Sequence, residues 1–412
     1  MPRASIVIPA YNAQGFIERT IASAQAQTIS DIEIVCVDDG STDQTLALLR
    51  RIAQDDPRIR VIAQENGGEG PARDTGLAAA TGDWLYFLDA DDLMAPTLLE
   101  KAIAYGEETG ADIVVFRTMM LDDQTGERRL CEWSFKREWT ADDVFCPREH
   151  PERILNSFQN WVHNKLFRGA FVRQHDLHFQ HVHRTADLLF TCSALVLAQR
   201  IALLDEPLHD YRVNNPQSAM ATSDSYPLDF YAAFLALRTF LEEHDLWDLY
   251  RTSFVNWAIE GVVVNLRGAR SYEGYRTIAD TMCGGGFRAL GITDFPRDDS
   301  DMPHYYDQLR PLVDGAPAEA LFRLASALRS ELTTAQTDAS AGRMRIGELE
   351  ERSARDRRII TDQEGQIVRL TRELDETRQD FFNVTNSRSF AIGRALTKVP
   401  RAVRDLLSAR RR

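Results

Sequence analysis

The chain reads WLYFLDADD over residues 84–92, an apolar run that ends in three carboxylates. Three apolar runs precede it, at 6–8, 32–37 and 59–62, and the first two gaps between them carry apolar residues at helical spacing. Strands that alternate with helices at such short intervals predict a mostly parallel sheet flanked by helices. We therefore predict an α/β fold, and in such sheets ligands bind beyond the carboxyl ends of the strands.

Carboxylates gather at that edge of the predicted sheet. The second strand ends in Asp38 and Asp39, and the fourth ends in Asp89, Asp91 and Asp92. Like charges held together cost folding energy unless a cation or hydrogen-bond donors meet them. Solvated loops with helix-capping aspartates would explain either cluster alone. The two clusters together favour a ligand site.

Four motifs in this order resemble family 2 glycosyltransferases, inverting enzymes with the GT-A fold, of the bacterial surface-polysaccharide type. The motifs are SIVIPAYN at 5–12, VDDGSTD at 37–43, NGGEGPARD at 66–74 and FLDADD at 87–92. The resemblance implies a GT-A domain over residues 1–225. It also implies an enzyme that moves a sugar from a nucleotide-sugar donor, with a UDP-sugar expected, to a glycan or lipid-linked saccharide acceptor.

The resemblance assigns donor binding to seven residues at or after the strand ends: Pro9, Ala10, Tyr11, Asp39, Asn66, Arg73 and Asp89. A fixed carboxylate at Asp39 can accept the imide N–H of uracil, and the ring of Tyr11 can pack on the base. Arg73 offers a fork of donors that suits a phosphate. An ion pair of Arg73 with Asp38 or Asp39 is the alternative interpretation.

The pair Asp89-x-Asp91 indicates a metal. Hard oxygen ligands beside a diphosphate recruit Mg²⁺ or Mn²⁺, which offsets charge on the leaving nucleoside diphosphate. By resemblance, Asp91 contacts the metal and Asp89 lies near the ribose and the metal. Asp92 is expected to begin and cap the next helix.

Inversion by direct displacement requires a carboxylate that takes the proton of the acceptor hydroxyl. The segments TADLLF at 185–190 and PLHDYR at 207–212 resemble, in spacing, the family's Glu-Asp pair and Tyr-x-Tyr-Arg-like segment. They identify Asp187 as the base, although Ala186 replaces the usual Glu. The alternative is that Asp187 only caps the helix that it begins.

Lys165 and four histidines are secondary candidates. Lys165 lies in NKLF at 164–167, a segment similar to one that precedes the base in the family, and would meet acceptor or phosphate or else be an ordinary surface lysine. His175, His178, His181 and His183 lack the spacing of a zinc site and no cysteine joins them. His181 or His183 could instead approach the donor phosphate or the metal.

The second half of the chain is predicted to be helical. Residues 226–317 form an accessory region, whose Gly-rich and Pro-rich end from 284 suggests a linker or a loosely packed stretch. Apolar residues recur in heptads over 318–385, but Asp356, Gln363 and Thr377 interrupt the seam. A coiled coil that forms a homodimer and an amphipathic helix docked on its own protein both remain open.

Charge separates the last segment from the rest. The chain carries 48 Lys and Arg against 62 Asp and Glu, for a net charge of −14, which argues against nucleic-acid binding. Residues 386–412 instead hold eight basic residues and one acid, with aliphatic residues between them. This pattern favours peripheral contact with an anionic membrane over a solubilising tail or an RNA-binding arm.

The start of the chain shows no secretory signal, no run of 18 apolar residues occurs, and the five cysteines form no CxxC pair. We therefore predict a cytoplasmic protein, peripheral on the inner face of the cytoplasmic membrane.

Three other functions fit the sequence less well. A sugar nucleotidyltransferase would carry a glycine-rich turn where this chain has PAYN at 9–12, and a dinucleotide-binding oxidoreductase would need a third glycine after Gly68 and Gly70. The remaining alternative is a catalytically inactive GT-A domain that acts as a membrane-associated scaffold through its coiled coil and basic tail. Ala186 argues for that alternative, and the acidic motifs argue against it.

Overall fold

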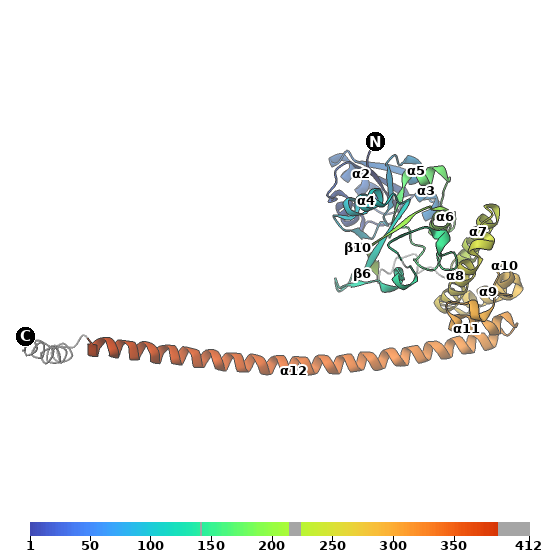
Figure 1. The fold of residues 1–412 in the computed structure, drawn as a ribbon. Coiled ribbons are helices and arrows are strands. Elements are labelled where there is room, and N and C mark those ends of the chain that lie inside the picture. The colour runs from blue at the N-terminus through green and yellow to red at the C-terminus, as the bar shows by residue number, and fades with distance from the viewer. Residues whose placement is uncertain (141, 214–223, 386–412) are drawn as a thin grey trace, which may run out of the picture. The chain divides into compact units, whose positions relative to one another are not determined.

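The computed structural model describes residues 1–140, 142–213 and 224–385 (Figure 1). It divides into a compact unit from Met1 to Ala325 and a second unit that begins at Ser326. The predicted basic tail, residues 386–412, lies outside the described residues.

Within the described ranges, ten strands form one mixed sheet with the order β3-β2-β1-β4-β9-β6-β10-β5, to which β7 adds on β6 and β8 on β10. The strands are β1 (Ala4–Ala10), β2 (Ile32–Asp39), β3 (Ile59–Gln64), β4 (Trp84–Phe87), β5 (Leu93–Met94), β6 (Ile113–Asp122), β7 (Arg128–Leu130), β8 (Val144–Phe145), β9 (Lys165–Arg168) and β10 (Ile201–Val213). The pairs among β1 to β4 are parallel, whereas β9 runs antiparallel to both β4 and β6. The four predicted strands and the predicted α/β fold are confirmed.

The helices cover both faces of the sheet. They are α1 (Ile17–Gln25), α2 (Thr45–Asp55), α3 (Glu69–Ala79), α4 (Leu98–Thr109), α5 (Gly169–Gln174), α6 (Asp187–Leu197), α7 (Asp229–Glu243), α8 (Trp247–Gly268), α9 (Tyr272–Thr281), α10 (Phe287–Ala289), α11 (Pro303–Val313) and α12 (Pro317–Thr385). Helices α1 and α2 match the windows in which helical spacing was read.

The central strands are apolar on both sides because each side of the sheet has a core of its own. Ile6 and Ile8 of β1 face a core shared with α1, α2 and α4, whereas Val7 between them faces the core that holds α6, α7 and α8. This alternation follows from the pleat of a strand. It also explains why these strands are continuous apolar runs.

The segment after residue 284 is packed, so the predicted linker or loose stretch is wrong there. Phe287, Leu290, Ile292 and Phe295 are buried in the same core as α8, and the residues of α11 that face inward join them. Gly291, which follows α10, makes a turn, because its φ of +74° is a left-handed conformation that favours glycine.

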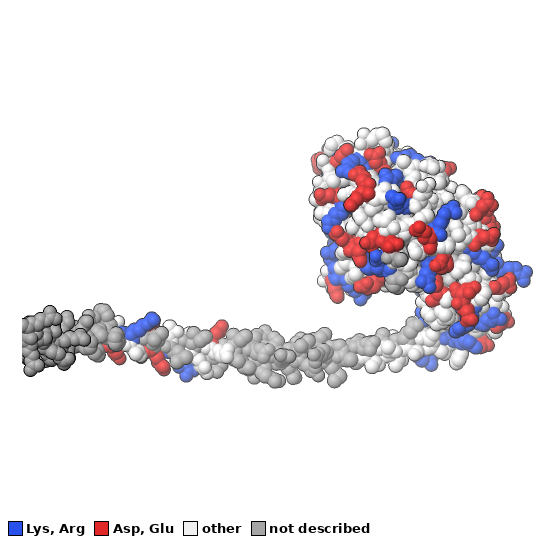
Figure 2. Space-filling model, in the orientation of Figure 1, with Lys and Arg blue, Asp and Glu red and all other residues white. Residues whose placement is uncertain are grey.

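Helix α12 confirms the predicted long helix. It begins in the first unit, where Ala320 and Leu324 are buried, and continues for 69 residues. Whether it pairs with a second copy stays a prediction. Among the described residues, no helix combines the length and the hydropathy needed to cross a membrane. On the face shown in Figure 2, acidic and basic side chains lie interspersed over the first unit.

Candidate active site

The carboxylate of Asp39 is fixed by the turn after β3. Asp39 Oδ1 accepts hydrogen bonds from Gln64 Nε2 at 2.7 Å and from the backbone N–H of Gly67 at 3.0 Å, while Oδ2 accepts from the N–H of Gly68 at 2.8 Å. Asn66 Nδ2 donates to the backbone carbonyl of Asp39 at 2.9 Å. The structure therefore brings together two of the predicted donor-binding residues, Asp39 and Asn66.

Pro9 and Ala10 end β1 directly beside the end of β2, because Ala10 pairs with Asp38 in the parallel register. Both are buried, whereas the next residue, Tyr11, is 52% exposed. The two loops are tied together, since Asn12 N–H donates to Ser41 Oγ at 3.0 Å. The ring of Tyr11 is thus presented at the carboxyl edge of the sheet.

Arg73 is almost fully buried in α3, at 2% exposure. Its Nη2 contacts Asp89 Oδ1 at 2.6 Å and Glu69 Oε1 at 2.7 Å, and its guanidinium lies over the ring of Phe179. The alternative ion pair with Asp38 or Asp39 is therefore wrong. Nε and Nη1 of Arg73 are buried and have no hydrogen-bond partner among the described residues. Buried donors left in this state are costly, so they are available to an anionic ligand.

Three carboxylates act on this arginine, those of Glu69, Asp89 and Asp187, and their charges also act on one another. Burial raises the pKa of Glu69 to about 7, although its side chain is 37% exposed; Arg73 opposes the rise, and Asp89, Asp187 and Asp91 add to it. Burial alone would raise the pKa of Asp89 as well, but Arg73 and His163 hold that pKa below its usual range. The site thus has more negative charge than one guanidinium neutralises.

Asp187 is the first residue of α6, as predicted. Thr185, just before it, has a φ of +63°, which is costly for a β-branched residue. The carboxylate of Asp229 holds the preceding loop, because it accepts the N–H groups of His183 and Arg184 at 2.9 and 3.0 Å. Burial raises the pKa of Asp187, Arg73 lowers it and Asp89 raises it further.

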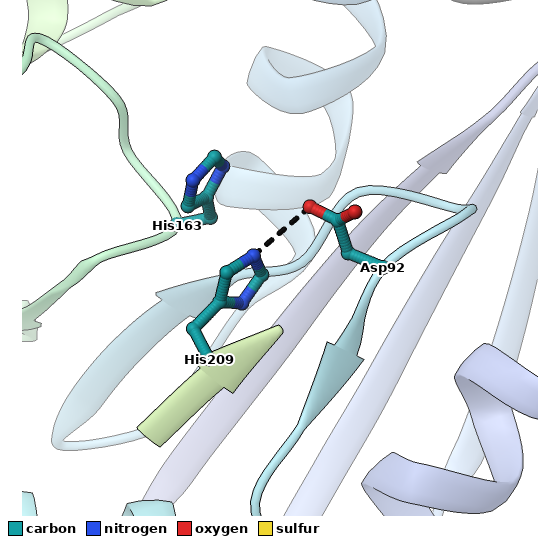
Figure 3. Close-up of side chains that lie close together, drawn as sticks. All are labelled: Asp92, His163 and His209. Carbon is teal, nitrogen blue, oxygen red and sulfur yellow. Dashed lines mark hydrogen bonds and ion pairs between the residues drawn. The ribbon is translucent and has the colours of Figure 1, made fainter. Parts of the chain in front are cut away.

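Asp92 does not cap a helix, which corrects the expectation from the sequence. It is buried, helix α4 begins only at Leu98, and β5 lies between them. Asp92 Oδ2 lies 2.9 Å from His209 Nε2, as drawn in Figure 3, and Oδ1 accepts the N–H of Arg212 at 2.8 Å. His209 Nδ1 in turn lies 2.8 Å from the hydroxyl of Tyr86. Asp92 therefore joins the loop after β4 to the end of β10.

Two sets of residues could hold a cation. Asp89 and Asp91 supply carboxylate oxygens at the mouth of the site, which suit Mg²⁺ or Mn²⁺. Potential ligand atoms of Asp92, His163 and His209 lie within 4.8 Å of one another, deeper in the fold (Figure 3). The rings of His163 and His209, however, are stacked with their centroids 4.2 Å apart and their planes at 13°. An ion held by both imidazoles must lie in the plane of each ring, so this stack would have to open first.

Lys165 is neither a surface residue nor free to meet a phosphate. It is fully buried, and its Nζ donates at 2.7 Å to three oxygens: the carbonyls of Gln159 and Trp161 and the side chain of Asn164. Burial lowers the pKa of Lys165 to about 7. The lysine fixes the backbone of the segment 159–164 from the inside.

The four histidines singled out in the sequence lie apart from the carboxylates or make local contacts. His181 Nε2 is 3.3 Å from Asp74 Oδ2, and the ring of His183 stacks on Tyr226 at 3.8 Å. His175 packs on Phe171, and His178 bonds a backbone carbonyl. None of the four belongs to the group of potential metal ligands found among the described residues.

Sequence reasoning missed Glu69, His163 and His209 at the site. Glu69 stands inside the motif at 66–74, His209 inside the segment at 207–212, and His163 directly before NKLF. His163 Nδ1 lies 3.4 Å from Asp89 Oδ2, while its buried Nε2 has no hydrogen-bond partner among the described residues. Each of the three could have been found from the sequence, because each is titratable and lies inside or directly beside one of the motifs.

Comparisons with known proteins agree with these observations. Residues 5–181 match the model of the family described as Glycosyl transferase family 2. The chain is 34% identical over 223 residues to the uncharacterized glycosyltransferase EpsJ of Bacillus subtilis strain 168, an alignment that covers 53% of this chain and 63% of EpsJ. It is also 34% identical over 216 residues to the succinoglycan biosynthesis protein ExoO of Rhizobium meliloti strain 1021, covering 51% of this chain and 60% of ExoO. The aligned part thus spans less than two thirds of either relative.

Among solved structures, the fold is similar to a crystal structure of residues 1–349 of Staphylococcus aureus TarS in complex with UDP-GlcNAc. The TM-score is 0.60 at 22% identity, and the match covers 80% of this chain and 92% of the TarS chain. The likeness supports the shared fold: a mixed sheet flanked by helices and followed by a helical region.

Proposed function

We propose that this chain, whose residues 5–181 match the model of glycosyl transferase family 2, transfers a sugar from a UDP-sugar to a saccharide acceptor, with inversion and with a divalent metal. The observation that carries the proposal is the group around Arg73. A buried guanidinium, two of whose nitrogens have no hydrogen-bond partner among the described residues, lies among Glu69, Asp89 and Asp187 at the carboxyl edge of the sheet. Such a group suits a metal-bound diphosphate beside a general base.

A uridine nucleotide is supported by the hydrogen bonds of Asp39. An ionised carboxylate has about four acceptor positions, and three donors from the chain already occupy Asp39. One position is left for the single imide N–H of uracil. A guanine base would present a ring N–H and an amino group, which need two acceptor positions. The exposed ring of Tyr11 can then cover the base.

The metal would be held by Asp89 and Asp91. The donor set is of the right kind, because both are carboxylates in a site whose negative charge one arginine does not balance. Bound there, Mg²⁺ or Mn²⁺ would supply Lewis-acid stabilisation of the leaving diphosphate. Arg73 would donate to the diphosphate through Nε and Nη1, and the contact of His163 keeps Asp89 in place.

Asp187 would accept the proton of the attacking hydroxyl. Burial raises its pKa, which strengthens it as a base. Glu69 contacts Nη2 of Arg73, and its pKa of about 7 allows its carboxyl group to be protonated or ionised near neutral pH.

Calorimetric titration of the full chain with UDP and with GDP, each with and without Mn²⁺, tests the proposal. We expect UDP to bind at least tenfold more tightly than GDP in the presence of Mn²⁺, and only weakly without the metal. Equal binding of UDP and GDP would contradict the role of Asp39. Failure of both nucleotides to bind in the presence of Mn²⁺ would overturn the enzyme assignment in favour of the inactive scaffold.

We also infer that the acceptor belongs to a surface polysaccharide and that residues 386–412 hold the enzyme at an anionic membrane. The relation to ExoO, which is named for succinoglycan biosynthesis, and the eight basic residues of the tail support this. Deletion of 386–412 is expected to abolish co-sedimentation with vesicles that contain phosphatidylglycerol. Neutral vesicles are the control, and unchanged sedimentation of the deletion variant would refute the inference.

A further inference from the structure

We propose that the acceptor of this chain is a pyranose ring, and that it binds on an aromatic platform formed by Trp133, Trp161 and Tyr211. This inference rests on the proposed function, because it names the class of acceptor that the same site would take. The platform lies on the segment between β6 and β9 and at the end of β10.

The three rings contact one another. Trp161 stacks on Tyr211 with the centroids 5.2 Å apart and the planes at 28°, and Trp133 meets Trp161 edge to face at 5.0 Å. Trp133 is 49% exposed, and the other two rings are half-buried. A tryptophan with half of its surface in water costs solvation free energy unless a ligand covers it.

The platform borders the reacting groups through the residues on either side of Trp161. Asn160 Nδ2 donates a long hydrogen bond, 3.5 Å, to Oδ1 of Asp187, the proposed base. His163 stacks on Tyr211 and contacts Asp89, the proposed metal ligand. A ring that lies on Trp161 is therefore next to the carboxylate that would take its hydroxyl proton.

The platform is held in shape before any ligand arrives. The ammonium of Lys165 binds the carbonyl oxygen of Trp161 from below, and Cys131 N–H, two residues before Trp133, donates to the carbonyl of Thr118 on β6. A prepared surface does not lose side-chain entropy on binding, so it gains affinity.

The chemistry of the platform selects a ring. A pyranose has an apolar face of C–H groups that packs on the negative face of an aromatic ring, and a polar rim of hydroxyl groups. Polar side chains adjoin the tryptophans in the sequence: Glu132, before Trp133, lies 3.7 Å from Arg117, and the amide of Asn160, before Trp161, bonds Asp187. An open-chain polyol has hydroxyl groups but no rigid apolar face.

The test follows the indole N–H signals of the full chain by NMR, in the presence of UDP and Mn²⁺. The probes are methyl β-D-glucopyranoside, methyl N-acetyl-β-D-glucosaminide and, as the open-chain control, sorbitol, each to 100 mM. We expect the signals of Trp133 and Trp161, assigned with the variants Trp133→Phe and Trp161→Phe, to shift with at least one pyranoside and not with sorbitol.

Substitutions give the second readout. Trp133→Ala is expected to weaken pyranoside binding about fivefold and Trp133→Phe less, as loss of one ring contact predicts. Tyr272→Ala, which removes an exposed aromatic ring on α9, is the matched control and should change nothing. Shifts that are equal for sorbitol and the pyranosides, or absent for both pyranosides, would overturn the proposal. If UDP still binds in that case, only the platform is refuted; if UDP does not bind either, the proposed function fails with it.

Discussion

Asp187→Asn is expected to reduce sugar transfer by about 10²–10⁴-fold, the usual range for loss of a general base. The amide has the shape of the carboxylate but cannot accept the proton of the acceptor hydroxyl. Binding of UDP with Mn²⁺ should be unchanged. Asp187 bonds Asn160 and is affected by the charge of Arg73, but it does not contact the turn at Asp39 that is proposed to bind uracil. The measurement is the rate of sugar transfer at saturating donor, together with the calorimetric Kd of UDP.

Two controls make this result specific. Asp55→Asn replaces an exposed aspartate at the end of α2 and should leave the rate unaltered. In the wild type the rate should fall as the pH is lowered, and the fall should begin above the usual pKa of an aspartate, because burial raises the pKa of Asp187. A variant that keeps more than a tenth of the rate would move the role of base to another carboxylate, with Glu69→Gln as the next experiment.

Asp91→Asn is expected to weaken UDP binding in the presence of Mn²⁺ by about 100-fold. A metal contributes several kcal/mol to the stabilisation of a diphosphate, and each 1.4 kcal/mol corresponds to a factor of ten in affinity. Without metal, the variant and the wild type should bind UDP equally weakly. The comparison is made by calorimetry at fixed ionic strength, because charge removal alone also changes long-range attraction.

Asp92→Asn provides the contrast one residue further along. Asp92 accepts from His209 and Arg212 and is buried, so its loss should lower the free energy of unfolding by about 1–3 kcal/mol, as for a buried hydrogen-bonded group. Metal-dependent UDP binding should persist in the folded fraction. If Asp92→Asn removed the metal dependence while Asp91→Asn kept it, the cation would have to be assigned to the deeper group of Asp92, His163 and His209.

The first ninety residues allowed good prediction because the information there is local. A strand that ends in aspartates places those aspartates at a known edge of a parallel sheet, so Asp39 and Asp89 could be named as candidate site residues before any contact was known. The same reasoning gave the order of strands and helices in this part of the fold.

Side-chain contacts could not be predicted from the sequence. The alternative from the sequence was an ion pair of Arg73 with Asp38 or Asp39. Its partners are instead Glu69, one turn away on the same helix, and Asp89, because α3 turns the guanidinium toward the end of β4. Lys165 was misread for the same reason: its three acceptors belong to a loop whose path the sequence does not specify.

Glycine and proline content misled in the region after residue 284. Turn-forming residues there indicate where the chain changes direction, but they do not indicate how tightly the chain is packed. Phe287 and Leu290 next to the glycines are buried, which shows that the turns bring apolar residues back onto α8. Glycine and proline content predicts where the chain turns, but only the tertiary contacts show which residues those turns bury.

The residues proposed to bind the donor and those proposed to bind the acceptor come from separate parts of the chain. The residues proposed for the nucleotide come from the parallel strands β1 to β4 and from α3, within the first hundred residues. Trp133, Asn160 and Trp161 instead lie in the segment between β6 and β9, residues 123–164, which contributes β7 and β8 to the sheet. None of the residues proposed to bind the nucleotide lies in this segment. Recombination confined to it is therefore expected to change the acceptor preference of an enzyme that keeps its donor.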